Sequence, residues 1–128
     1  SISCISIKST DKIKPSIIML ERTACFGSCP IYKIEIFPTG NGVFTGKKNI
    51  EKIGVFKFQI SKSQVRKILD LADRINFKEM KDRYYEPITD LPRTYIRIEE
   101  KKIEDYFGAP KELKELERLI DQIVFGEL

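Results

Sequence analysis

Large apolar residues occupy every second position in two stretches of the first half of the chain, 31–37 and 55–60. Such alternation places successive side chains on opposite faces of a strand, one toward a core and one toward water. Shorter apolar runs at 17–23 and 43–45 predict two further strands, and the turn residues of 38–42 join the second strand to the third. The first half of the chain therefore predicts four strands in an antiparallel meander.

A helical pattern follows these strands. Ser61 and Gln64 have the spacing of a capping box, in which each side chain bonds to the backbone amide of the other residue at a helix start. Beyond them the apolar positions recur every three or four residues, as on one face of a helix: Val65, Ile68, Leu69, Ala72 and Ile75. We expect this helix to end at Asn76, with one further turn within 77–82.

Strands and a helix recur in the second half of the chain. Alternation in 94–98 and an apolar return in 102–107 predict a hairpin with a tight turn between them. Pro110 suits the first turn of a helix, where its missing amide leaves no bond unmade. The apolar stripe that follows ends at Gly126, a residue typical of helix ends.

These elements predict an α+β fold with the order four strands, helix, two strands, helix. We expect an antiparallel sheet of about six strands with both helices packed on one face, because the inward apolar positions need cover. The stretch 84–92, which holds two prolines, predicts an irregular loop. Residues 1–16 form a polar N-terminal arm and 17–128 a single domain, a size usual for one domain.

The composition excludes several classes of site. The chain has no histidine, which removes Ser-His-Asp catalysis and histidine metal sites. Its 23 Lys and Arg residues exceed its 19 Asp and Glu residues by a net +4, spread without a block, so we expect no nucleic-acid partner. The longest aliphatic run, 17–20, is far shorter than the ~20 residues of a membrane span, so we expect no transmembrane segment.

The chemically distinctive stretch holds Cys25 and Cys29, four positions apart between two predicted strands. Such a pair closes a disulfide when the α-carbons lie within ~7 Å, and Gly27 makes the turn easier. We predict that the two cysteines are bonded, which would indicate an oxidising compartment. Two alternatives stay open: a thiol redox centre in which the charge of Arg22 favours a thiolate, and a metal site completed by a carboxylate and by Cys4.

Glu86 and Asp90 lie four positions apart in the predicted loop. They fit either a general acid and base or loop carboxylates that accept hydrogen bonds from nearby amides. Without a third catalytic partner we favour the second interpretation and predict no catalytic residue.

Four segments share a wider pattern: Leu20-Glu21-Arg22-Thr23, Cys25-Phe26-Gly27-Ser28-Cys29-Pro30 with Tyr32, Asp90-Leu91-Pro92, and Tyr106-Phe107-Gly108-Ala109-Pro110. Together they resemble the signature of a bacterial domain of unknown function, family 6438. The resemblance covers roughly Ile17 to Val124. It implies a small domain that often follows an export or lipoprotein signal, and it implies no assigned activity.

We therefore expect a binding or structural domain outside the cytoplasm rather than an enzyme, although a cytoplasmic location stays open. Its partner would be an unknown protein or a small-molecule ligand, with no cofactor and no bound metal. The candidate binding residues are Arg22, Cys25, Gly27, Cys29 and Asp90.

A lipid anchor is open upstream of the chain or at Cys4. The alternative for Cys4 is an incidental thiol in a tail, and the poor match of Ser1 to a lipid signal favours it.

Overall fold

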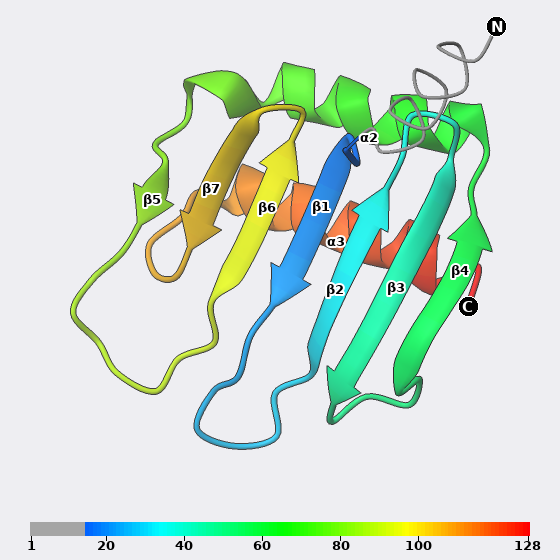
Figure 1. Ribbon diagram of the computed structural model, residues 1–128. Helices are drawn as coiled ribbons and strands as arrows, with labels where there is room; N and C mark the ends of the chain where they lie inside the picture. The colour runs from blue at the N-terminus through cyan, green and yellow to red at the C-terminus, as the bar shows by residue number, and fades with distance from the viewer. Residues whose placement is uncertain (1–14) are drawn as a thin grey trace, which may run out of the picture.

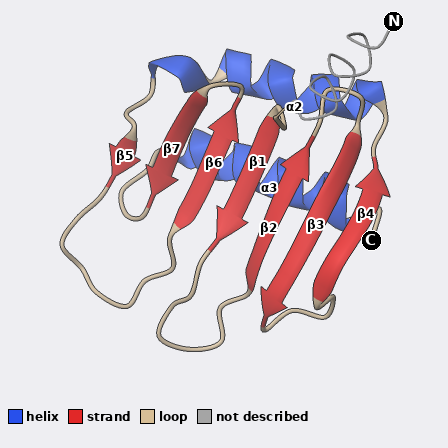
Figure 2. Ribbon diagram, in the orientation of Figure 1, coloured by secondary structure: helices blue, strands red, loops and turns tan. Residues whose placement is uncertain are grey.

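The computed structural model describes residues 15–128. Within them the chain forms one seven-stranded sheet and two α-helices, which lie on the same face of the sheet (Figures 1 and 2). This confirms the predicted α+β fold. Residues 1–14 of the predicted arm, Cys4 included, lie outside the described residues.

The strand order is β4-β3-β2-β1-β6-β7-β5. The strands are β1 (Ile18–Arg22), β2 (Ile31–Ile36), β3 (Asn41–Lys48), β4 (Gly54–Gln59), β5 (Arg83–Tyr84), β6 (Thr94–Ile98) and β7 (Lys101–Asp105). The predicted meander and the predicted hairpin are both present, and β1 joins them by pairing with β2 and with β6. Every pairing is antiparallel except that of β5 with β7.

The helices are α2 (Lys62–Arg74) and α3 (Lys111–Phe125), with a 3-10 turn η1 at Phe77–Glu79. Ser61 and Gln64 form the capping box expected at the start of α2. Pro110 precedes α3 as its N-cap rather than occupying the first helical position. Gly126 ends α3, as the sequence predicts.

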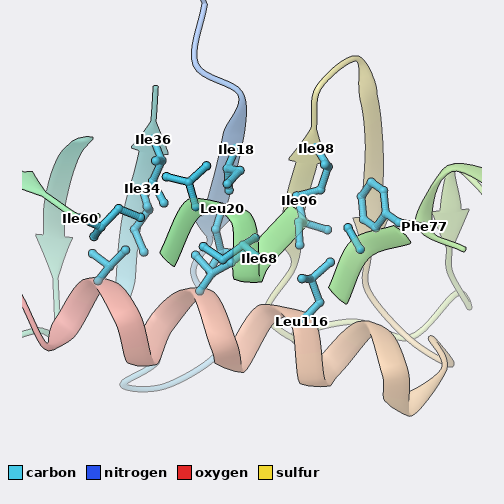
Figure 3. Close-up of a cluster of buried hydrophobic side chains, with 14 of the residues drawn as sticks. Ile18, Leu20, Ile34, Ile36, Ile60, Ile68, Phe77, Ile96, Ile98 and Leu116 are labelled. Carbon is cyan, nitrogen blue, oxygen red and sulfur yellow. The ribbon is translucent and has the colours of Figure 1, made fainter. Parts of the chain in front are cut away.

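The core lies between the sheet and the two helices. Alternate residues of the central strands point into it, so that Ile18, Ile34 and Ile96 are fully buried. Ile68 of α2 and Leu116 of α3 close the layer from the other side (Figure 3). Burial of this apolar surface is the main source of stability for such a fold.

The sheet has seven strands where the sequence predicted about six, because the short β5 pairs with the outer side of β7. Ser16, which we assigned to the polar arm, is buried: it accepts a hydrogen bond from Arg97 Nη2 at 2.6 Å and donates one to Glu35 Oε2 at 3.2 Å. Ser16 therefore packs against β2 and β6 although it lies in the predicted arm.

Antiparallel pairing brings four connections to one end of the sheet, the lower end in Figure 1. We call this the loop end. It consists of residues 23–30, 49–53, 85–93 and 106–110. The chain enters β1 at the opposite end of the sheet.

Candidate functional site

Cys25 and Cys29 are bonded to each other, as the sequence predicts. Their disulfide closes a five-residue ring within the loop between β1 and β2, with an α-carbon separation of 5.7 Å. Gly27 has a φ of 143°, a conformation that strains any residue with a side chain. Phe26 projects from this ring with 86% of its surface exposed.

The neighbouring loops hold the disulfide ring from both sides. The Phe26 amide donates to the carbonyl oxygen of Asp90 at 3.3 Å. Asn49 Nδ2 donates to the carbonyl oxygen of Cys29 at 3.1 Å. The ring therefore has a defined position, and the exposure of Phe26 is a property of a braced loop.

Asp90 takes part through its backbone. Its φ of 68° lies in the left-handed region, and its carbonyl oxygen accepts from Phe26 while the residue is exposed to solvent. The structure thus places Asp90 next to the disulfide ring. The contact is made by its backbone carbonyl oxygen, which the turn positions.

Two stacked tyrosines lie between two arginines beside the loop that holds Asp90. The Arg83 guanidinium lies 3.9 Å from the Tyr85 ring centre, Tyr85 stacks on Tyr106 at 5.4 Å, and Arg93 lies 4.4 Å from the Tyr106 ring centre. The Tyr106 hydroxyl also donates to the carbonyl oxygen of Ile88. Cation–π contacts of this kind fix side chains at low entropic cost.

Exposed apolar side chains gather at the loop end or beside it. Among residues 15–128 the large exposed ones are Phe26, Ile53, Val55, Tyr85, Ile88, Phe107 and Phe125. All but Phe125 lie in the loop-end segments or within two residues of them, and Phe125 ends α3. These residues come from several separate segments along the loop end, and Phe26 is the most exposed of them.

A hollow of about 760 Å³ opens beside the disulfide ring. Its lining includes Pro30, Tyr32, Ile50, Lys52 and Phe125. The volume falls within the roughly 300–1,000 Å³ range of ligand sites. This end of the molecule therefore has both a projecting aromatic group and a recess next to it.

Arg22 belongs to a separate cluster behind the ring. Its guanidinium donates to Tyr32 Oη at 2.8 Å, to Thr94 Oγ1 at 2.9 Å, and to the carboxylates of Glu117 and Asp121 at 3.4 and 2.7 Å. These partners come from β2, β6 and α3. These bonds anchor the arginine to the helix side of the sheet.

The register of the sheet explains this cluster. Arg22 pairs across the strands with Tyr32 and with Thr94, and Thr94 pairs with Asp105, so four polar residues form one row on the helix face. The row faces a stripe of α3 residues at helical spacing: Lys114, Glu117 and Asp121.

Burial and charge shift the ionisation of the cluster. Burial raises the pKa of Tyr32 above its usual range, and the hydrogen bond that its hydroxyl donates to Asp121 at 2.6 Å adds to this shift. Burial is the largest single effect on Arg22 and acts to lower its pKa, but the charges and hydrogen bonds of Asp121 and Tyr32 together outweigh burial and raise that pKa. Both groups stay protonated at neutral pH, so the cluster holds α3 against the sheet.

The sequence interpretation missed most of this cluster. It assigned Tyr32 to the core and gave no role to Thr94, Asp105, Glu117 or Asp121. A signal was available: Thr94 and Asp105 stand at positions that continue the inward phase of their strands, where an apolar residue is expected.

The disulfide also bears on the metal interpretation. With the two sulfurs bonded to each other, neither is a thiolate that could ligate a metal. Within residues 15–128 no group of three or more His, Cys, Asp or Glu residues could hold a metal ion. In the same part of the chain, neither helix combines the length and the apolar character that crossing a membrane requires.

The family model described as Domain of unknown function (DUF6438) matches residues 16–124. The chain belongs to this family. The match spans the sheet, both helices except the last residue of α3, and the disulfide ring. No curated protein and no solved structure matches the chain.

Proposed function

We propose that this DUF6438 domain is a non-catalytic binding module outside the cytoplasm, and that its loop end contacts a protein partner. The observation that carries the proposal is Phe26, which is 86% exposed on a ring closed by a disulfide. An aromatic side chain in water is costly, and a partner that covers it recovers that free energy.

The bracing of the ring favours binding over a purely structural role. The hydrogen bonds to Asp90 and Asn49 and the cross-link between Cys25 and Cys29 fix the tip before any partner arrives. A preorganised loop loses little entropy on binding, which raises affinity without new contacts.

The surroundings of Phe26 fit an interface for a protein. Exposed Ile88 lies in the loop that accepts a hydrogen bond from the disulfide ring. The hollow beside Pro30 offers a recess for a side chain of the partner. A projecting aromatic anchor within an apolar patch is the usual centre of such interfaces.

The sulfur chemistry supports the proposed compartment. Disulfides persist in oxidising environments and are rare in the cytosol, so the Cys25–Cys29 bond supports export. The chain enters the sheet at the end opposite the ring.

Photo-crosslinking in the producing cell tests the proposal. A photoreactive residue replaces Ile88 in the loop end, and in a control protein it replaces Glu100, which is exposed at the opposite end. We expect a discrete protein adduct from position 88 that disappears when Phe26→Ser is added. Adducts of equal yield from both positions, or an adduct that Phe26→Ser leaves unchanged, would contradict the proposal.

A further inference from the structure

Two buried carboxyl groups meet where α3 crosses the end of β7. Asp105 is the last residue of β7, and Glu117 lies on the buried face of α3. Each is only 2% exposed. Lys114 of α3 lies 2.7 Å from Asp105 and three positions before Glu117, so both carboxyl groups lie beside the same turn of the helix. Neither has a part in the proposed contact with a partner, so this feature goes beyond the proposed function.

The oxygens of this pair lack donors. Both carboxyl oxygens of Asp105, and Oε2 of Glu117, have no hydrogen-bond partner among residues 15–128. Lys114 Nζ lies 2.7 Å from Asp105 Oδ2 as an ion pair, without the alignment of a hydrogen bond. Unpaired buried acceptors are rare because they lose their water without a replacement.

The charges around the pair do not balance. Three carboxylates meet here, on Asp105, Glu117 and Asp121, and two cations face them, Lys114 from α3 and Arg22 from β1. The cluster therefore has one surplus negative charge if every acid is ionised.

Two hydroxyl side chains from other strands and the buried face of α2 also lie in this region, and none of them carries a charge. Tyr32 of β2 and Thr94 of β6 are neutral hydroxyls, and α2 buries only apolar residues: Val65, Ile68 and Ala72. A buried surplus charge is strongly unfavourable, so a proton is the simplest ligand that removes it.

We propose that Asp105 and Glu117 form a proton-binding site, in which Glu117 is the acid that donates to the Asp105 carboxylate at neutral pH. One proton on Glu117 Oε2 neutralises the surplus charge. It also makes Oε2 a hydrogen-bond donor to one of the Asp105 oxygens, which otherwise has no donor among residues 15–128. Burial and the neighbouring Asp105 carboxyl raise the pKa of Glu117 to about 8, against the opposing effects of Lys114 and Arg22.

Loss of this proton has a defined structural consequence. It leaves two adjacent carboxylates in the joint between α3 and the sheet, and their repulsion acts to separate the helix from β7. The segment 106–110 connects these two elements and belongs to the loop end. The site therefore makes the packing behind the loop end sensitive to mildly alkaline pH.

A carboxyl-detected NMR titration of the ¹³C-labelled protein, from about pH 4 to pH 10, tests the site. We expect the Glu117 carboxyl resonance to titrate with a midpoint above about pH 7, and the Asp105 resonance to move in the same step. Glu115→Gln, a change at an exposed position of the same helix, should leave that step in place. A Glu117 midpoint below about pH 6 would overturn the proposal.

Two variants separate a shared proton from other causes. Asp105→Asn removes the acceptor charge and should lower the Glu117 midpoint by about one pH unit or more. Glu117→Gln carries a permanent donor, so its melting temperature should fall less between about pH 6 and pH 9 than that of the parent. If Glu117→Gln does not fold, the Asp105→Asn titration decides alone. A midpoint that shifts with Ca²⁺ but not with equal ionic strength of Na⁺ would identify a metal site and overturn the proton assignment.

Discussion

Arg22 and Asp121 stand 99 positions apart in the sequence, and their side chains form an ion pair with an Nη2–Oδ2 distance of 2.7 Å. The pair ties the central strand to the last helix directly behind the disulfide ring. Each side chain is about one-fifth exposed, so water screens the pair only in part. We regard this contact as the link between the core of the domain and its loop end.

Replacing Arg22 by Ala should destabilise the domain more than loss of a surface ion pair. The change leaves Asp121 and Glu117 without their cation, and we expect a loss of about 2–3 kcal/mol in the free energy of unfolding. Arg66→Ala is the matched control, because Arg66 and Asp70 form an exposed pair at 3.8 Å whose loss should cost about 0.5 kcal/mol or less. Urea denaturation measures both, and equal losses would refute the assigned role.

Removing the disulfide should lower stability without changing the fold. A ring of five residues contributes about 2 kcal/mol through the entropy of the unfolded chain. We expect the double variant Cys25→Ser/Cys29→Ser to lose about this amount and to keep the circular dichroism spectrum of the parent. Thiol labelling of the non-reduced exported protein should modify neither cysteine, and labelling of both would show that the ring is open.

Gly46 is needed for close packing between β3 and the turn before β4. A Cβ added at this position would lie 1.8 Å from the backbone oxygen of Lys52, a clash that only a shift of the turn relieves. We expect Gly46→Ala to cost about 3 kcal/mol in unfolding free energy. Gly108→Ala has free space around its Cβ but a φ of 84°, so it should cost only about 1 kcal/mol. The reverse ranking in thermal denaturation would be inconsistent with this packing.

Stability should decline as pH rises through the neutral range. The pKa of Glu117 is raised from 4.5 in the unfolded chain to about 8 in the folded domain. Between these values the folded state keeps a proton that the unfolded state has released, so this group's contribution falls with pH by at most about 1.4 kcal/mol per unit. The decline should level off above about pH 8.

Urea denaturation at several pH values measures this slope. Glu117→Gln should reduce it, because the amide cannot release a proton, and Glu112→Gln should not, because Glu112 is exposed on α3. An equal slope in the parent and in Glu117→Gln would mean that other groups cause it.

Much of the sheet could be predicted because apolar residues alternate with polar ones along most of β2, β4 and β6. The strand β5 could not be predicted, because its two residues, Arg83 and Tyr84, are polar and too few to show a period. Its parallel pairing with β7 also leaves no pattern in the local sequence. The length of β3 was also underestimated. Gly42 and Gly46 are typical of turns, but here they give room to the Phe58 ring and to the backbone at Lys52.

The candidate site was predictable only where chemistry is local. Two cysteines four positions apart indicate their own bond, whereas the contacts of Arg22 depend on which strands become neighbours. Lys114, Glu117 and Asp121 fall on one side of a helix by spacing alone, but the sequence does not show that this side faces β1 and β7. Long-range register decides this, and no local pattern encodes it.

The central claim is tested most directly by calorimetry with the partner that crosslinking identifies. The partner's affinity for the parent protein is compared with its affinity for the Phe26→Ser variant. If Phe26 anchors the interface, its loss should weaken binding at least about 30-fold, the effect of removing a hot-spot residue. Lys62→Ser, at an exposed position at the opposite end of the sheet, should leave the affinity unchanged. Equal affinities of the parent and of Phe26→Ser would contradict the assignment of the loop end as the binding surface.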